Sequence, residues 1–289
     1  MRLAYLVSPA AAVPPLHALL AEGHEVKIVV TQPDRRRGRG VELVPTPVKA
    51  AAVEAGLPVT DKVDDVLGAG AELGVVVAYG RLIKPHVLEQ LPMINLHFSL
   101  LPRWRGAAPV ERAILAGDTE TGVCVMALEE GLDTGPVYRR EVVPIGADET
   151  ADQLRHRLVE VGTTLLVETL GQGLGDPEPQ VGEPTYAAKI EVDELRLDWD
   201  RPVVELHRLV RIGRAWTTFR GRRLRVLQAR IADAEASTPA AGVIEGLLVG
   251  TGDGGVLELV EVQPEGKPPM PARAWVNGAH PQPGEQLGP

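Results

Sequence analysis

An amide and an imidazole stand two residues apart at the start of the stretch NLHFSLLPRWRGAAP, which runs from Asn95 to Pro109. The apolar run before them is typical of a buried strand, and alternation along a strand points Asn95 and His97 to the same side. If the strand ends there, both polar tips project past the carboxyl end of a sheet, where open α/β folds bind ligands. The pair equally suits a turn cap at Asn95 and a hydrogen-bonded buried His97, so it does not by itself establish a catalytic site.

A third candidate, Asp133, lies in the sequence GLDTGPVY. We expect strands over 122–128 and 138–143 that form a hairpin at the sheet edge, with Asp133 at its tip. Aspartate before Thr-Gly is also ordinary turn chemistry, which leaves a purely structural role open.

The pattern of potential metal ligands predicts no metal site. The seven histidines are scattered without an H-x-x-x-H or H-x-E spacing, and the single cysteine, Cys124, lies in an apolar run. One cysteine also excludes an internal disulfide framework.

The elements that must position these residues alternate between strand and helix periods. The strand-like runs cover residues 2–7, 25–30 and 73–78, and the helical runs cover 16–21, 47–55, 110–116 and 150–170. The helix over 47–55 has a capping residue in Thr46 and a proline in its first turn. Strands that alternate with short helices predict βαβ units and a mostly parallel sheet, to which the Asn95 strand belongs.

The composition changes at 171–184 (GQGLGDPEPQVGEP), which is typical of a linker. Beyond it, a helical run and several short strand-like runs separated by glycine-rich turns predict a small β-barrel. The helical run covers 203–213, and the strand-like runs cover 224–229, 243–249, 256–262 and the region near Ala274. The sequence GTGDGG at 250–255 has the spacing of a dinucleotide fingerprint, but strand-like runs flank it on both sides, so we expect a hairpin turn.

The 289 residues carry a net charge of −9, yet the arginines are clustered. Eight lie between Leu206 and Arg230 with no acidic residue among them: Arg208, Arg211, Arg214, Arg220, Arg222, Arg223, Arg225 and Arg230. Four more lie in a long loop over 31–47: Arg35, Arg36, Arg37 and Arg39. Local patches decide which polyanion docks, so both clusters favour a nucleic acid. The alternatives are a solvated loop and arginines that pair with acids elsewhere in the chain.

No run approaches the length of a membrane span. The apolar run at the N-terminus is short and is followed by two prolines and a helix-like segment, so we interpret it as strand, turn and helix rather than as a signal peptide. Both observations predict a cytoplasmic protein without a membrane partner.

The central stretch, followed by AGDTETGV and GLDTG, closely resembles the methionyl-tRNA formyltransferase family, whose members formylate the initiator methionyl-tRNA. Shorter matches extend the resemblance over most of the chain: TQPDR, GRG, PTPVK, VVVAYG, TYAAKI, LDW and VQPEGKPPMPA. The block SLLPRWRGAAP is highly specific, whereas the shorter pieces carry weight through their order.

The resemblance implies an α/β fold: a Rossmann-like, mostly parallel sheet domain followed by a small OB-like β-barrel domain. We place the formyltransferase domain, which binds 10-formyltetrahydrofolate, at residues 1–183, a linker at 184–200 and a C-terminal tRNA-binding domain at 201–289. The resemblance further implies initiator methionyl-tRNA as the partner, and we expect a monomer.

By motif, the catalytic residues implied are Asn95, His97 and Asp133, and the folate-contacting residues are Ser99, Leu100, Leu101 and Pro102. The implied tRNA-binding residues are Arg39, with Arg35, Arg36 and Arg37, and Arg220, Arg222 and Arg223. Attack of an amine on the formyl carbon creates an oxyanion, which the Asn95 amide and a protonated His97 can stabilise. Asp133 is then expected to position His97 and to assist proton transfer, with no metal required.

Three features depart from the family pattern: Phe98 replaces the usual glycine after the histidine, Val7-Ser8-Pro9 replaces a Gly-Thr-Pro turn, and RIGRAWTTF is shortened. Other folate-dependent formyltransferases, acting on a nucleotide-linked amino sugar or on glycinamide ribonucleotide, share the same three catalytic residue types. A deformylating hydrolase and a tRNA-binding protein with an inactive site are further alternatives, and the arginine clusters favour a large polyanionic substrate over a small one.

Overall fold

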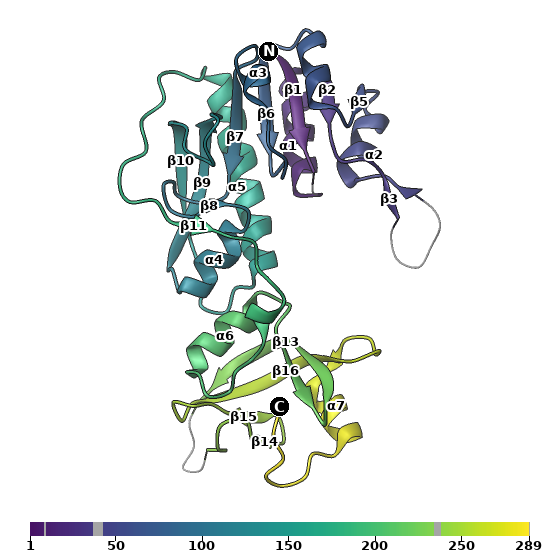
Figure 1. Ribbon diagram of the computed structural model, residues 1–289, viewed down its shortest axis with the longest axis vertical. Coiled ribbons are helices and arrows are strands. Elements are labelled where there is room, and N and C mark those ends of the chain that lie inside the picture. Colours follow the sequence, from purple (N-terminus) through teal and green to yellow (C-terminus); the bar gives the residue numbers. More distant parts are fainter. Residues whose placement is uncertain (9, 37–42, 234–237, 289) are drawn as a thin grey trace. The chain divides into compact units, whose positions relative to one another are not determined.

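The computed structural model describes residues 1–8, 10–36, 43–233 and 238–288, and it divides into two compact units (Figure 1). The first unit comprises Met1–Val110, Glu120–Pro144 and Arg155–Ala188. The second comprises Glu111–Thr119, Ile145–Leu154 and Lys189–Pro289. Two short stretches from the middle of the sequence therefore belong to the same unit as the C-terminal residues.

The first unit is built on a seven-stranded sheet in the order β10-β9-β7-β6-β1-β2-β5. Its strands are β1 (Arg2–Val7), β2 (Glu25–Val30), β5 (Val59–Thr60), β6 (Leu73–Val77), β7 (Met93–His97), β9 (Glu120–Ala127) and β10 (Val137–Pro144). β1 pairs in parallel with β2 and β6, as β6 does with β7 and β2 with β5. β9 runs antiparallel to both β7 and β10. The predictions of a mostly parallel sheet and of a hairpin at its edge are confirmed.

The helices of this part of the chain begin where the sequence places caps and prolines. They are α1 (Val13–Ala21), α2 (Pro47–Glu54), α3 (Pro85–Leu88), α4 (Pro109–Ala116) and α5 (Ala151–Gly171). The Thr46 hydroxyl accepts the Lys49 N–H at 3.1 Å, and Pro47 occupies the first turn of α2, as predicted. Such a cap satisfies one of the donors that a helix leaves unpaired at its start.

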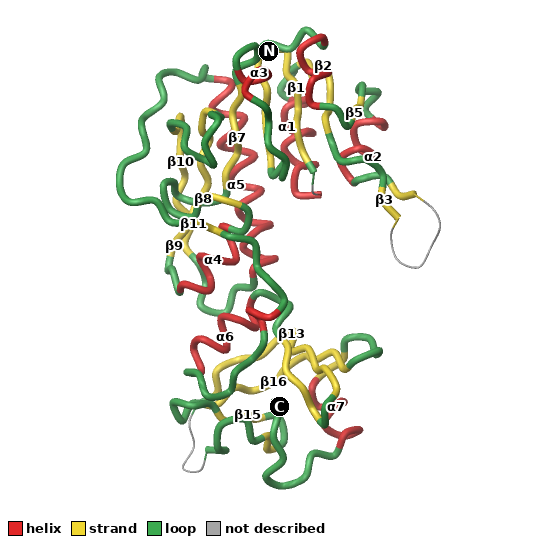
Figure 2. Tube along the Cα trace, in the orientation of Figure 1, coloured by secondary structure: helices red, strands yellow, loops and turns green. Residues whose placement is uncertain are grey.

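Close packing brings α5 against the strands that carry the candidate site (Figure 2). A Cβ at Gly162 would lie 3.1 Å from Val123 Cγ1 and 3.2 Å from Leu96 Cδ2, so the helix approaches β7 and β9 closely at this glycine. Every residue of β7 is buried. This packing fixes the strand whose end bears Asn95 and His97.

The stretch after α5 has the composition of a linker but is hydrogen bonded to the first unit. Val137 and Glu178 exchange both backbone hydrogen bonds, at 2.8 and 2.9 Å. Further on, β11 (Tyr186–Ala187) pairs in parallel with β8 (Arg105–Gly106). Residues 178–187 thus pair with β10 and with β8, and Figure 2 shows the long loop that leads into β11.

The second unit contains α6 (Val203–Arg211), a six-stranded antiparallel sheet and α7 (Ala272–Ala279). Its strands are β12 (Trp216–Phe219), β13 (Arg222–Ala232), β14 (Ile244–Glu245), β15 (Leu248–Gly250), β16 (Val256–Pro264) and β17 (Met270–Pro271). Gly250 pairs with Val256 across the β15–β16 hairpin, so the hairpin expected for GTGDGG is confirmed. Within the described residues, no helix is both long and apolar enough to cross a bilayer.

Two details of the predicted strands are wrong. The run 243–249 is two strands, β14 and β15, because the chain turns at Gly246, whose φ of +61° suits glycine. The region near Ala274 is the helix α7, in which Ala272 and Trp275 are buried three residues apart, a helical spacing. Short apolar runs do not distinguish helix from strand, and here a helix begins directly after Pro271, its N-cap residue.

Candidate active site

One cavity of about 640 Å³ brings Asn95, His97 and Asp133 together in the first unit. It opens beyond the carboxyl ends of β6 and β7, which are adjacent parallel strands. Asn95 and His97 are 8% and 5% exposed, as expected for side chains at the end of a central strand. The sequence-predicted trio thus lines a single hollow, and its chemical roles stay predictions.

Both ring nitrogens of His97 face protein acceptors. Nε2 lies 2.9 Å from the carbonyl oxygen of Trp104, and Nδ1 lies 3.6 Å from Oδ2 of Asp133. The second distance exceeds a hydrogen bond, so the Nδ1 side of the ring can be shared with a ligand. In the doubly protonated imidazole each N–H faces an acceptor, whereas the neutral ring offers only one N–H.

Trp104 is itself held in an uncommon backbone conformation, with a φ of +61°. Its N–H donates to the hydroxyl oxygen of Thr185 at 2.9 Å. The carbonyl that accepts from His97 is therefore positioned from a residue far along the chain.

Asp133 lies in the turn between β9 and β10 and also has a positive φ, +50°. Its Oδ2 accepts the N–H of Gly106 at 2.8 Å. Gly106 has a φ of +122°, and a Cβ there would lie 2.9 Å from the carbonyl oxygen of Ala187. A glycine is thus needed at the position whose N–H holds the Asp133 carboxylate.

The Asn95 side chain forms no hydrogen bond with any described residue, although it is almost fully buried. Its two N–H donors are therefore available to a ligand in the cavity.

Much of the remaining cavity wall comes from two loops for which the sequence suggested no site role beyond Asp133. One follows β6 and contributes Tyr79, Arg81, Leu82 and Ile83; the other, at 128–132, leads to Asp133. Leu82 and Leu132 are 79% and 60% exposed, which is unusual for leucine and leaves an apolar surface at the cavity. The signal available in the sequence was the run VVVAYG, whose end meets the same sheet edge as Asn95.

The residues expected to contact folate, Ser99, Leu100, Leu101 and Pro102, are not among those that line this cavity. Ser99 is buried and donates its hydroxyl to the Arg103 carbonyl at 2.6 Å. Leu101 packs with Cys124, Met126 and Val137. Contact of these four residues with folate stays a prediction.

Two of the three departures from the family pattern have a defined setting in this unit, although Pro9 of the Val7-Ser8-Pro9 turn lies outside the described residues. Phe98 is 9% exposed and forms part of the cavity wall beside His97. In the first turn, Val7 is buried, and the Ser8 hydroxyl donates to the Tyr79 carbonyl. Ser8 thereby ties the first turn to the loop that lines the cavity.

The predicted tRNA-binding arginines fall into two groups. Arg37 and Arg39 lie outside the described residues, and Arg35 and Arg36 form β3 (Arg35–Arg36), which pairs with β4 (Leu43–Val44). In the second unit, Arg220 pairs with Glu285 at 2.6 Å and lowers the pKa of that carboxyl to about 2. Arg222 approaches Glu265 at 3.9 Å, and the Arg223 guanidinium lies 4.1 Å from the centre of the Trp216 ring. Ion pairing with distant acids therefore occurs in this cluster, and tRNA binding by these arginines stays a prediction.

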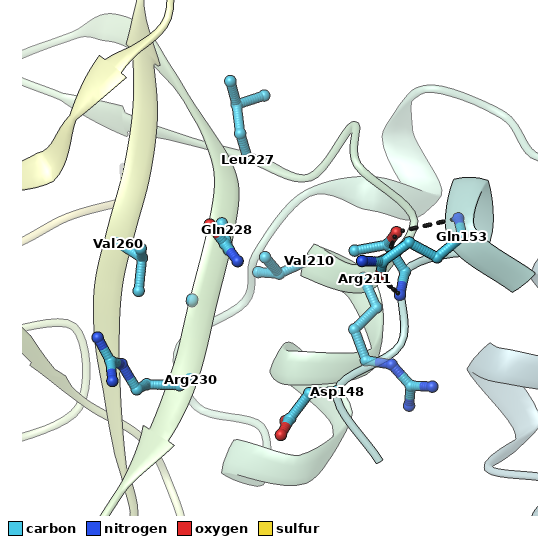
Figure 3. Close-up of a pocket in the computed structure, with 10 residues that line it drawn as sticks. Asp148, Gln153, Val210, Arg211, Leu227, Gln228, Arg230 and Val260 are labelled. Carbon is cyan, nitrogen blue, oxygen red and sulfur yellow. Dashed lines mark hydrogen bonds between the residues drawn. The ribbon is translucent and has the colours of Figure 1, made fainter. Parts of the chain in front are cut away.

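A second cavity, of about 430 Å³, lies within the second unit (Figure 3). The buried Arg211 guanidinium donates to the carbonyls of Glu149 and Gly146, both at 2.8 Å. Thr150 and Gln153 form a capping box at the start of α5, as the dashed lines in Figure 3 mark. The hydrogen-bonding groups of Arg211, Thr150 and Gln153 are therefore used within the protein, and we assign them a structural role rather than a ligand-binding one.

His207 lies beside Asp148, which lines this cavity, and its burial leads us to predict that the stability of the protein depends on pH. Its Nε2 lies 3.5 Å from Asp148 Oδ1, and its side chain is buried. Burial lowers the pKa of His207 and outweighs Asp148, so the unfolded chain binds the proton more readily and stability falls as the pH drops below about 6.5. We expect His207→Gln to lose less free energy of unfolding than the wild type between about pH 7.5 and 5, measured by urea denaturation. The exposed His17→Gln is the control, and equal losses in all three proteins would contradict this prediction.

Comparison with known proteins places the chain among formyltransferases. The family model described as formyl transferase matches residues 1–170, and the model of the formyl transferase C-terminal domain matches residues 189–280. A methionyl-tRNA formyltransferase of Dinoroseobacter shibae is 46% identical over 295 residues, covering 96% of this chain and 97% of that protein. One of Symbiobacterium thermophilum is 42% identical over 313 residues, covering 100% and 96%.

Solved structures share the fold at lower identity. An N-formyltransferase from Helicobacter canadensis, in complex with folinic acid and dTDP-3-aminofucose, has a TM-score of 0.71 and 16% identity, covering 89% of this chain and 98% of that one. A methionyl-tRNA formyltransferase from Clostridium thermocellum has a TM-score of 0.61 and 14% identity, covering 81% and 95%. The fold class predicted from the sequence, a Rossmann-like parallel-dominated sheet followed by a separate antiparallel sheet domain, is confirmed.

Proposed function

We propose the function that follows from the family to which this chain belongs, the methionyl-tRNA formyltransferases. The protein transfers the formyl group of 10-formyltetrahydrofolate to the α-amino group of initiator methionyl-tRNA in the cytoplasm, for the initiation of translation. The observation that carries this proposal is the single cavity that collects Asn95, His97 and Asp133 beyond the end of β7. Residues 1–183 act as the catalytic domain and residues 201–289 as the tRNA-binding domain of a monomer.

The cavity fits a flat, partly polar folate ring. Its volume of about 640 Å³ lies within the range of small-molecule sites, and its wall includes Leu82, Ile83 and Leu132. The wall also carries two polar side chains that can bond the edge of such a ring, those of Asn95 and Tyr79. We therefore place the formyl donor between the loop after β6 and the loop before Asp133, in addition to its predicted contact with Ser99–Pro102.

The reaction forms one bond and breaks one. The neutral α-amine of the methionyl ester attacks the formyl carbon, and much of this amine is unprotonated at neutral pH because α-amino groups titrate near pH ~7.7–8.0. The carbonyl oxygen becomes an oxyanion, to which the Asn95 amide and the Nδ1–H of His97 donate hydrogen bonds. Collapse of the intermediate breaks the bond from the formyl carbon to the folate nitrogen and releases tetrahydrofolate.

We assign Asp133 a part in the proton transfers of this reaction. The attacking amine must lose a proton, and the departing folate nitrogen must gain one. The Asp133 carboxylate lies beside His97 and is held by the Gly106 N–H, so it orients the imidazole and takes part in this relay.

The loop arginines provide a prediction for tRNA binding. Arg39→Ala removes a charge that we assign to a phosphate contact, and we expect tRNA affinity to weaken and the slope of log affinity against log salt to fall by about one. Filter binding at several salt concentrations measures this slope. Arg230→Ala is the matched control, because Arg230 already pairs with Glu258 at 3.0 Å. An unchanged slope in Arg39→Ala would exclude the phosphate contact.

Single-turnover transfer of labelled formyl tests the proposed function as a whole. The enzyme is offered 10-formyltetrahydrofolate with charged initiator tRNA and, in competition, a sugar-nucleotide amine. Formylated methionyl-tRNA is the expected product. Transfer to the small amine alone would assign the chain to the amino-sugar enzymes, and tRNA binding without transfer to either would mean an inactive site.

A further inference from the structure

The side chain of Gln180, in the linker-like stretch after α5, bridges two loops of the candidate site. Its Oε1 accepts from Nε and Nη2 of Arg105, at 3.1 and 2.7 Å. Its Nε2 donates to the carbonyls of Asp133 and Gly135, at 2.9 and 2.8 Å. The guanidinium is only a donor and the carbonyls are only acceptors, so the orientation of the amide is determined by its partners.

Gln180 donates to the turn at residues 133–135, whose backbone conformation is tightly restricted. Asp133 adopts a left-handed conformation, uncommon for a residue other than glycine, which persists only where neighbours hold it. Two residues on, a Cβ at Gly135 would lie 2.0 Å from the Ala127 carbonyl oxygen. The two carbonyls that accept from Gln180 therefore belong to a tight turn, and the first of them is that of Asp133 itself.

The other partner of Gln180 connects to the same carboxylate. Arg105 directly precedes Gly106, whose N–H donates to Asp133 Oδ2 at 2.8 Å. The Asp133 carboxylate is thus held by the N–H of Gly106, the residue after Arg105. The Asp133 carbonyl is held by the Gln180 side-chain amide, which Arg105 orients. The exchange of backbone hydrogen bonds between Glu178 and Val137 keeps the Gln180 segment in place beside this turn.

We propose that Gln180 is a positioning residue for Asp133: its amide holds the Asp133 turn so that the carboxylate faces His97. This inference rests on the proposed function and adds a residue that touches neither the formyl donor nor the amine. To hold the turn in this way, the side chain at position 180 must donate to the carbonyls of the turn and accept from Arg105. Glutamine can do both, whereas an ionised glutamate can only accept from Arg105.

The difference between alanine and glutamate at this position separates positioning from plain structural support. Gln180→Ala removes both sets of contacts. Gln180→Glu keeps an acceptor for Arg105, as an ion pair, but directs an oxygen at the two carbonyls in place of the N–H donors. A residue that merely anchored the linker would tolerate glutamate, whereas a residue that holds the Asp133 turn would not.

Kinetics at saturating concentrations of both substrates provide the test. We expect kcat to fall about 10- to 100-fold in both variants, with KM for the formyl donor within about twofold, because a small misplacement of a catalytic group lowers the rate of the chemical step. In an Asp133→Asn background the same substitutions should have almost no further effect on kcat, since Gln180 acts through that carboxylate. Gln172→Ala is the matched control, because Gln172 accepts from Arg139 in the same stretch and does not contact the turn.

Several outcomes would overturn the inference. Wild-type kcat in Gln180→Glu with a loss only in Gln180→Ala would make the residue a structural anchor. An unchanged loss in the Asp133→Asn background, or an equal loss in Gln172→Ala, would show that the effect does not pass through Asp133. Thermal unfolding of each variant identifies any that fail to fold. If Gln180→Ala does not fold, the kinetics of Gln180→Glu decide the outcome. Absence of formyl transfer by the wild type would instead count against the proposed function.

Discussion

Replacement of His97 by alanine should lower the rate of formyl transfer by about 1,000-fold or more, since it removes a donor to the oxyanion and the partner of Asp133 together. Its ring lies between the Trp104 carbonyl and the Asp133 carboxylate, so alanine would leave both acceptors without this partner. Binding of tRNA should remain within about threefold of wild type, because the assigned contacts for the nucleic acid lie elsewhere. Single-turnover transfer and filter binding measure the two quantities.

The control for this substitution is His17→Ala, which replaces an exposed histidine on α1 and should leave both quantities unchanged. Because His97 is buried, the folded state of the variant must be checked by thermal unfolding. Loss of tRNA binding together with transfer would assign His97 a structural role. Transfer within about tenfold of wild type would remove it from the oxyanion site.

Replacement of Asn95 by aspartate should be at least as harmful as removal of one oxyanion donor, which costs about 100- to 1,000-fold in rate. The two side chains have the same shape, but aspartate presents an ionised oxygen where the amide offers N–H donors. A negative charge beside a developing oxyanion opposes the reaction, so Asn95→Asp should be slower than Asn95→Ala. Rapid-quench measurement of a single turnover distinguishes the two variants.

The other asparagine of the chain, Asn277, lies exposed on α7 and provides the matched control. Asn277→Asp should leave the rate of transfer unchanged. Equal rates for Asn95→Asp and Asn95→Ala would show that the amide does not face the reacting oxygen. Wild-type rates in both would contradict any catalytic role for Asn95.

These predictions concern groups that come from distant parts of the chain. Asn95 and His97 lie at the end of β7, Asp133 in an edge hairpin, and Gln180 in the crossover that follows α5. The crossover also carries Thr185, which positions the carbonyl opposite the His97 ring. Gln180 therefore contacts Asp133 directly, and Thr185 is connected to His97 through Trp104.

The sequence by itself determined the elements and the candidate trio, because these depend on local patterns. Apolar runs and their alternation located β6 and β7, and a threonine before a proline located the start of α2. Asn95 and His97 share a side of one strand for the same local reason. The aspartate at the hairpin tip followed from turn chemistry and from the resemblance to a known family.

Only the tertiary structure decided which groups these residues meet. The acceptor for His97 Nε2 is a backbone carbonyl, that of Trp104, and a carbonyl leaves no trace in residue type. The partners of Arg220 and Arg222 are glutamates more than forty residues away, so net charge could not reveal them. Hydrogen bonds between distant segments depend on how the chain folds back on itself, and that information is absent from any local window of sequence.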